Sequence, residues 1–121
     1  MTQTQTQTRT GGCHCGAVRY EAESDLALVV ECNCSRCSAK GFILTFVPVD
    51  AFRVTAGEDQ LTEYQFHKHQ IRHLFCATCG VQAFARGERP DGGRMVALNV
   101  RTMDGVDLAG LKPTPVDGRS F

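Results

Sequence analysis

Short stretches that alternate apolar and polar residues, or that are rich in β-branched and aromatic residues, recur along the chain. Residues 17–23, AVRYEAE, alternate between apolar and polar from Val18 onward, as expected for a strand with one buried face. Residues 42–47, FILTFV, are β-branched and aromatic, and Pro48 follows them. Six further stretches read as strands: 26–31, 52–57, 61–66, 71–75, 81–86 and 95–100. Because Gly, Asp and Pro turns separate these stretches, the pattern predicts an all-β, mainly antiparallel domain.

Three segments depart from this pattern. Residues 1–10, MTQTQTQTRT, form a polar tail with no apolar face to bury, and we expect this tail to be disordered. Residues 34–40 are compatible with one or two helical turns, which Gly41 would end. Residues 111–121 carry two prolines and are expected to be mostly irregular. The expected organisation is therefore a disordered tail, residues 1–10, followed by a single domain, residues 11–121.

The composition narrows the class of protein. A chain of 121 residues, 42% of them hydrophobic, is long enough for one domain with one core. Thirteen basic residues balance thirteen acidic ones, so no charge excess favours nucleic acid as a partner. The apolar stretches are too short to span a membrane, and the first residues lack the pattern of a secretory signal. We therefore expect a cytoplasmic location, where thiols stay reduced.

The chain contains seven cysteines, which fall into three clusters. The clusters are Cys13 and Cys15, then Cys32, Cys34 and Cys37, and then Cys76 and Cys79. An odd number of cysteines leaves one thiol out of any closed disulfide framework, and neighbours at C-x-C spacing are poor disulfide partners. Clustered thiols in a reducing compartment are typical of metal ligands or catalysts, so the pattern favours metal binding over disulfides.

The first and last clusters share their main features. Each supplies two thiolates, each is followed by glycine, and each borders a predicted strand. A turn that directs two sulfurs toward one ion often needs a residue with positive φ, which glycine adopts readily. Zinc prefers four tetrahedral ligands, and thiolates suit it well. We therefore predict that Cys13, Cys15, Cys76 and Cys79 hold a structural zinc that stabilises the fold.

The middle cluster then remains for a second zinc, giving two per chain. Cys32, Cys34 and Cys37 supply three ligands, and a catalytic zinc commonly keeps its fourth position for water or substrate. A zinc held by three thiolates suits a further soft ligand, such as a substrate thiol. One of four histidines could instead close the site: His14, His67, His69 or His73. The three thiols could also be redox-active, because Arg36 or Lys40 nearby would make a thiolate more reactive.

The motifs GGCHCGAVRYE, CNCSRC and FCATCG, taken together in this order, resemble the glutathione-dependent formaldehyde-activating enzyme family, which includes centromere protein V. The resemblance runs from about residue 11 to residue 100 and implies a β-tent fold. In this fold two small antiparallel sheets pack together, as in Rab guanine-nucleotide-release factors. It also implies that the outer cysteine pairs hold a structural zinc and that Cys32, Cys34 and Cys37 hold a catalytic one. The implied activity is that of a carbon–sulfur lyase, which interconverts glutathione plus formaldehyde with S-hydroxymethylglutathione.

These observations lead to one main hypothesis and two alternatives. In the main hypothesis, a small thiol occupies the open position of the second zinc, and its thiolate adds to an aldehyde. Arg36, Lys40 and Arg72 are candidates for binding the carboxylates of a peptide-like thiol. The expected partners are thus a small thiol and an aldehyde, with neither nucleic acid nor a membrane. The first alternative is a non-catalytic, zinc-stabilised β module for protein interaction. The second is a thiol sensor that uses the middle cluster.

Overall fold

The computed structural model describes residues 7–24, 26, 29–32, 39, 42–65, 71–88 and 93–116. Within these ranges the chain forms strands and short 3-10 turns. The strands are β1 (Gln7–Gly12), β2 (Arg19–Ser24), β3 (Val30–Cys32), β4 (Leu44–Pro48), β5 (Phe52–Ala56), β6 (Leu61–Tyr64), β7 (Ile71–Cys76), β8 (Phe84–Glu88), β9 (Arg94–Asn99) and β10 (Thr114–Val116). The 3-10 turns are η1 (Val49–Ala51), η2 (Glu58–Gln60), η3 (Val100–Thr102) and η4 (Leu108–Gly110). None of the helices in the described part has the length and apolar character needed to cross a bilayer.

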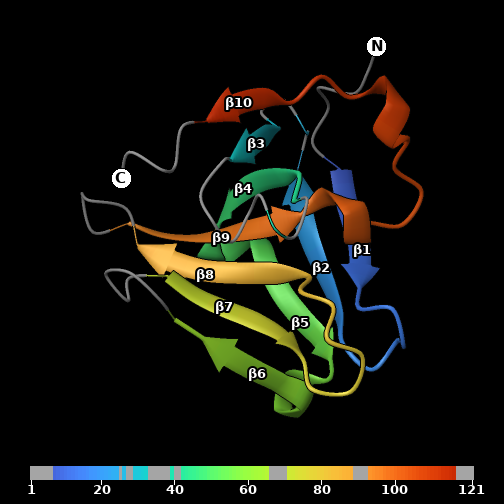
Figure 1. Cartoon of the computed structure of the whole chain (residues 1–121), viewed down its shortest axis with the longest axis vertical. Coiled ribbons are helices and arrows are strands. Elements are labelled where there is room, and N and C mark those ends of the chain that lie inside the picture. Colours follow the sequence, from blue (N-terminus) through green and yellow to red (C-terminus); the bar gives the residue numbers. More distant parts are fainter. Residues whose placement is uncertain are drawn as a thin grey trace.

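The strands form two sheets of unequal size (Figure 1). The smaller sheet has three strands in the order β1-β2-β5, all antiparallel. The larger sheet has seven strands in the order β10-β3-β4-β9-β8-β7-β6. Adjacent strands in this sheet are antiparallel, except for β10 and β3, which run parallel. The prediction of an all-β, mainly antiparallel fold built from two sheets is therefore confirmed.

Two segments differ from the sequence-based expectation. Residues 7–10 belong to β1, which pairs with β2 from Gln7↔Ser24 to Gly12↔Arg19, so the expected tail cannot extend to residue 10. A polar Thr/Gln strand can form there because backbone pairing with β2 replaces the missing apolar face. Thr114–Val116 form an edge strand within the segment expected to be irregular, at a position where proline is tolerated. Residues 1–6 and the expected helical turns at 34–40, apart from Ala39, lie outside the described residues.

Three aromatic rings connect the two sheets through the core. Tyr20 of β2 and Phe52 of β5 come from the smaller sheet, and Phe84 of β8 comes from the larger one. The ring centroids lie 4.8 Å apart for Phe52 and Phe84 and 6.2 Å apart for Tyr20 and Phe84. Tyr20 and Phe84 are each only 1% exposed. Their burial supplies apolar area and ring contacts that hold one sheet against the other.

The segment after β9 is tied to the smaller sheet by polar contacts at Asp104. The Asp104 carboxylate pairs with the Arg19 guanidinium and accepts a hydrogen bond of 2.8 Å from the Thr10 hydroxyl. The Asp104 backbone N–H donates to the Thr10 carbonyl oxygen at 2.8 Å. The Arg19 hydrogen bond is the main reason that the pKa of Asp104 lies below its ordinary value.

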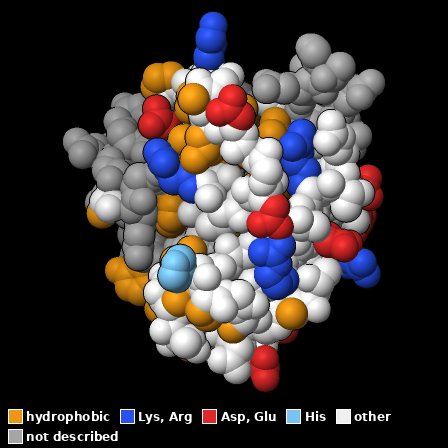
Figure 2. Space-filling view, turned by 90° about the vertical axis from the view of Figure 1, so that its right-hand side faces the viewer, with side chains coloured by type: hydrophobic (Ala, Val, Ile, Leu, Met, Phe, Trp, Pro, Cys, Tyr) orange, Lys and Arg blue, Asp and Glu red, His pale blue; other side chains and the backbone are white. Residues whose placement is uncertain are grey.

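On the face seen in Figure 2, basic and acidic side chains are interspersed.

Candidate metal centre

Two loops of similar construction carry the outer cysteines. The first follows β1 and spans residues 13–18, and the second begins at the end of β7 and spans residues 76–81. In the first, the Cys13 N–H donates to the Val18 carbonyl oxygen at 3.1 Å. In the second, the Cys76 N–H donates to the Val81 carbonyl oxygen, also at 3.1 Å. Each loop of six residues is therefore closed by a hydrogen bond between its first and last residues.

The glycine that follows each cysteine pair adopts the backbone conformation expected from the sequence. Gly16 has φ of 84° and Gly80 has φ of 80°. In the second loop, the Gly80 N–H also donates to the Cys76 carbonyl oxygen at 2.9 Å. A residue with a Cβ is strained at such positive φ, so glycine permits both turns. The prediction that each cysteine pair ends in a turn made by glycine is confirmed.

One connecting segment supports both loops. Gly57, which precedes η2, has φ of 83°, and a Cβ there would lie 2.1 Å from the Ala17 carbonyl oxygen of the first loop. Three residues later, the Gln60 carbonyl oxygen accepts a hydrogen bond of 2.7 Å from the Ala77 N–H of the second loop. The segment 57–60 thus contacts each loop through its backbone, which helps to place loops about sixty residues apart in sequence beside each other.

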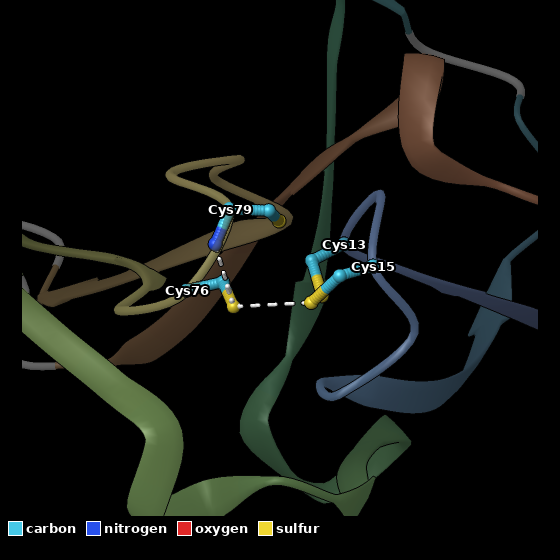
Figure 3. Close-up of side chains that lie close together, drawn as sticks. All are labelled: Cys13, Cys15, Cys76 and Cys79. Atoms are coloured by element: carbon cyan, nitrogen blue, oxygen red, sulfur yellow. Dashed lines mark hydrogen bonds between the residues drawn. The ribbon is translucent and has the colours of Figure 1, made fainter.

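The four outer cysteine sulfurs converge between the loops (Figure 3). All four Sγ atoms lie within 4.8 Å of one another. The Sγ atom of Cys15 lies 3.6 Å from that of Cys13 and 3.7 Å from that of Cys76. Sulfurs placed about 2.3 Å from one tetrahedral zinc would lie about 3.8 Å from each other. The four thiols are free rather than disulfide-bonded, and their spacing fits a metal ion of this kind.

Backbone N–H groups point at two of these sulfurs. Val18 N–H donates to Cys13 Sγ at 3.3 Å, and Thr78 N–H donates to Cys76 Sγ at 3.4 Å. The Cys79 N–H also donates to Cys76 Sγ, at 3.5 Å. Such contacts favour the thiolate over the thiol. They are consistent with the pKa of Cys76, which lies below its ordinary value chiefly because of the hydrogen bond from Cys79.

The remaining two thiols differ in their acidity. Hydrogen bonds from the Val81 and Cys15 backbone N–H groups lower the pKa of Cys79 to about 6. For Cys15, the backbone hydrogen bond from Ala17 lowers the pKa, but hydrogen bonds to the other thiols, together with desolvation, raise it to about 11. Neighbouring thiolates repel one another, so all four can ionise together only beside a positive charge. A bound cation would supply that charge.

The middle cysteines lie mostly outside the described residues. Cys32 is the last residue of β3, and only its backbone is described, while Cys34 and Cys37 are not described. Four further residues named from the sequence also lie outside the described residues: His67, His69, Arg36 and Lys40. The Arg72 side chain is exposed, and its Nε donates to Glu63 Oε1 at 2.9 Å. The prediction of a second metal at the middle cluster therefore remains a prediction.

A network of buried polar side chains lies on the face of the larger sheet opposite the core, and the sequence predicted only one of its residues. His73 of β7 is buried, as are Gln82 and Asn99, which precede β8 and end β9. The Nε2 atom of Gln82 lies 3.5 Å from Nδ1 of His73. The Asn99 Nδ2 donates to the Gln82 carbonyl oxygen at 2.9 Å. We call these three residues the outer-face network. The sequence analysis named His73 only as a possible metal ligand, and His14, the other described histidine, is exposed.

A shallow depression of about 140 Å³ lies on the smaller sheet, away from the cysteine loops. Its lining residues are Thr8, Glu21, Ala22, Glu23, Asp50, Ala51, Phe52 and Arg53. Arg53 is already paired with Glu21 at 2.7 Å. None of the lining residues is a cysteine or a histidine, so thiol and metal chemistry point to the cysteine loops and not to this depression.

The two sheets and the converging thiols define an all-β protein with a four-cysteine site suited to a metal ion. The sequence matches the family described as glutathione-dependent formaldehyde-activating enzyme over residues 8–115, and the chain belongs to this family. Its structure is similar to the crystal structure of a Rhodobacter sphaeroides protein from a structural genomics programme, with a TM-score of 0.77. The two sequences are 34% identical, and the similarity covers 88% of this chain and 97% of the other.

Proposed function

We propose that the protein is a zinc-dependent carbon–sulfur lyase that joins a small thiol to an aldehyde. The observation that carries this proposal is the family match over residues 8–115, together with the convergence of the four outer thiols that the family's motif pattern implies. Glutathione and formaldehyde are the proposed substrates because the family description names both. A reducing cytoplasm would keep the seven cysteines free to bind metal and is the proposed location.

Two metal sites with different tasks are proposed. Cys13, Cys15, Cys76 and Cys79 would hold a structural zinc, because their spacing and their N–H···S contacts suit four thiolate ligands. This ion would join the two cysteine loops and so hold residues 11–121, together with the start of β1, in one domain. Cys32, Cys34 and Cys37 would hold a second zinc with one position left for substrate. When bound there, zinc supplies a lowered thiol pKa, so that substrate thiolate is present near neutral pH.

The proposed reaction balances without any redox partner. The substrate thiolate forms the new carbon–sulfur bond with the aldehyde carbon, and the carbonyl electron pair moves to oxygen, which takes a proton from water. The product is a hydroxyalkyl thioether, and its breakdown follows the same steps in reverse. The protein's share in this reaction is to position the two substrates and to stabilise the charge that develops on the oxygen.

The variant Cys34→Ser tests the proposed function, with Ser35→Ala as the matched control. Exchange between glutathione and ¹³C-labelled formaldehyde can be measured by NMR, with the uncatalysed rate subtracted. We expect the wild type and Ser35→Ala to accelerate exchange. We expect Cys34→Ser to lose the acceleration, to retain one zinc per chain and to stay folded. Full acceleration by Cys34→Ser would exclude the middle cluster as the reaction site, and no acceleration by the wild type would exclude this substrate pair.

A further inference from the structure

The four outer cysteines differ in how far solvent reaches them. Cys15 is exposed, and so are the residues on either side of it. Cys79 is half-buried, while Cys13 is 7% exposed and Cys76 is 1% exposed. Each loop therefore contributes one buried cysteine and one that is more accessible. Of these four residues, Cys15 is the one that a small reagent in solvent reaches most easily.

The turn that carries Cys15 is open on its outer side. A Cβ built on Gly16, the next residue, would meet no atom within 4 Å. On its inner side the loop is closed by the hydrogen bond of 3.1 Å between the Cys13 N–H and the Val18 carbonyl oxygen. The loop therefore presents Cys15 to solvent and keeps Cys13 behind it.

A sulfur of the opposite loop lies beside Cys15. The Sγ atoms of Cys15 and Cys76 are 3.7 Å apart, although the two residues are 61 positions apart in sequence (Figure 3). The sulfurs of a disulfide lie about 2.05 Å apart, so a modest approach of the two side chains would form this bond. Cys13 Sγ is also close to Cys15 Sγ, at 3.6 Å, but a disulfide at C-x-C spacing is strained.

Cys76 is suited to attack an oxidised neighbour. The Thr78 and Cys79 N–H groups donate to its sulfur at 3.4 Å and 3.5 Å, which favours the nucleophilic thiolate and fixes its position. Because Cys76 is almost fully buried, a reagent in solvent does not reach it directly. The site thus pairs an accessible thiol with a protected one from the other loop, the arrangement that disulfide formation by an oxidant requires.

We propose that Cys15 is an oxidation site, and that a peroxide converts Cys15 and Cys76 into a disulfide that replaces the structural zinc as the link between the loops. The inference rests on the proposed structural zinc. The Cys15 thiolate attacks the peroxide and becomes a sulfenic acid, and hydroxide leaves. The Cys76 thiolate then displaces a second hydroxide from that sulfur. The sulfurs together lose two electrons, the O–O bond is reduced, and protons from solvent convert both hydroxides to water.

The structure indicates what this change would do to the site. Cys13 and Cys79 alone are too few ligands for a closed tetrahedral zinc, so the oxidised site should release the ion. Segment 57–60 contacts both loops through its backbone and does not depend on the sulfurs. The new disulfide would close a long loop of chain and so restrain the unfolded state. The oxidised protein should therefore stay folded without this zinc.

The test uses the variant in which Cys32, Cys34 and Cys37 are all serine, so that the outer cysteines are its only thiols. Hydrogen peroxide is added to the zinc-loaded protein, and a chromophoric chelator reports the zinc released. Dimedone traps sulfenic acid, and peptide mapping without reductant locates the disulfide. We expect about one zinc released per chain, dimedone on Cys15 and a Cys15–Cys76 bond. The same bond is expected in the wild type treated in parallel.

Thermal unfolding supplies the control. The oxidised protein should unfold cooperatively, whereas reduced protein stripped of zinc by the chelator should not. A disulfide within one loop, either Cys13–Cys15 or Cys76–Cys79, would overturn the proposal. Zinc retained after the peroxide is consumed, or loss of cooperative unfolding on oxidation, would overturn it as well. A protein that holds no zinc before peroxide is added would instead overturn the proposed structural zinc.

Discussion

The four-cysteine site and the outer-face network both bring polar groups from distant segments together, but they are stabilised in opposite ways. The four sulfurs of Cys13, Cys15, Cys76 and Cys79 lie close together, and their pKa values diverge, with Cys15 raised to about 11 and Cys79 lowered to about 6. Like charges at this spacing require a cation between them. The outer-face network is built from amides and an imidazole, and its members form hydrogen bonds with one another and with backbone groups just before β8 and just after β9.

This contrast indicates which part of the protein would depend on the proposed metal ion and which part depends on the sheet. The cysteine site joins two loops about sixty residues apart, so its geometry and the local fold should be lost together with the ion. The outer-face network is anchored in the register of adjacent strands and should survive as long as the larger sheet does.

Loss of one outer thiol should have the largest effect on stability. Cys76→Ser leaves three thiolates around a buried position and removes two N–H···S contacts. Structural zinc in small finger peptides has an apparent binding free energy of about 10–16 kcal/mol, more than a domain of this size can lose. We therefore expect Cys76→Ser to lose cooperative thermal unfolding, measured by circular dichroism. Ala77→Ser, at the exposed next position, is the matched control and should unfold like the wild type.

Loss of the anchor of the outer-face network should have an intermediate effect. Asn99→Ala removes the donor to Gln82 and the acceptor for Arg101 N–H. Leaving such buried groups without partners costs about 1–3 kcal/mol. We expect chemical denaturation to show a loss in this range. Zinc content should be unchanged, because the cysteine loops are tied to segment 57–60 rather than to Asn99. A loss of metal from Asn99→Ala would show that the two regions are not independent.

Alanine substitutions at two glycines should show whether the turn at Gly80 contributes to the zinc affinity of the cysteine site. Gly80 and Gly105 both have positive φ, 80° and 70°, and a Cβ at either position would meet no atom within 4 Å. Alanine at each should therefore cost about 1 kcal/mol from backbone strain alone. Gly80→Ala should also weaken zinc binding in a competition titration with a chelator, because Gly80 ends a cysteine loop. Equal zinc affinity in the two variants would contradict that role.

The ion pair of Asp104 with Arg19 should have the smallest effect, and one that depends on pH. The folded-state pKa of Asp104 is depressed, so its contribution is present above the unfolded pKa of about 3.9 and is lost as the pH falls through the folded pKa. Both side chains are partly exposed, so we expect about 1 kcal/mol or less. Asp104→Asn should be less stable than the wild type at pH 7 in urea titrations. The difference should vanish in acid, and a difference that persists there would exclude the ion pair as its cause.

Local chemistry explains which features the sequence could predict. Cysteine spacing and the glycines after each pair specified the two loops, because Gly16 and Gly80 must adopt positive φ for the sulfurs to turn together. Alternation in residues 17–23 likewise predicted a strand, which is found at Arg19–Ser24, and Tyr20 and Ala22 are buried as that pattern requires. These signals lie within a few residues of the feature that they predict.

Pairing between distant strands explains what the sequence could not show. Residues 7–10 look like a polar tail, and they form a strand only because β2 offers a partner in register. The contact of Gln82 with Asn99 depends on β8 and β9 lying side by side, and neither residue stands out in its own segment. His73 is buried on the outer face, although alternation along β7 would predict an exposed side chain at this position.

We infer that the outer cysteines alone form a complete metal site. The direct test is zinc content and X-ray absorption of a variant in which Cys32, Cys34 and Cys37 are all changed to serine. We expect one zinc per chain, surrounded by four sulfurs at about 2.3 Å, in a protein that still folds. A chain with no zinc, or a zinc with nitrogen or oxygen among its ligands, would contradict the account.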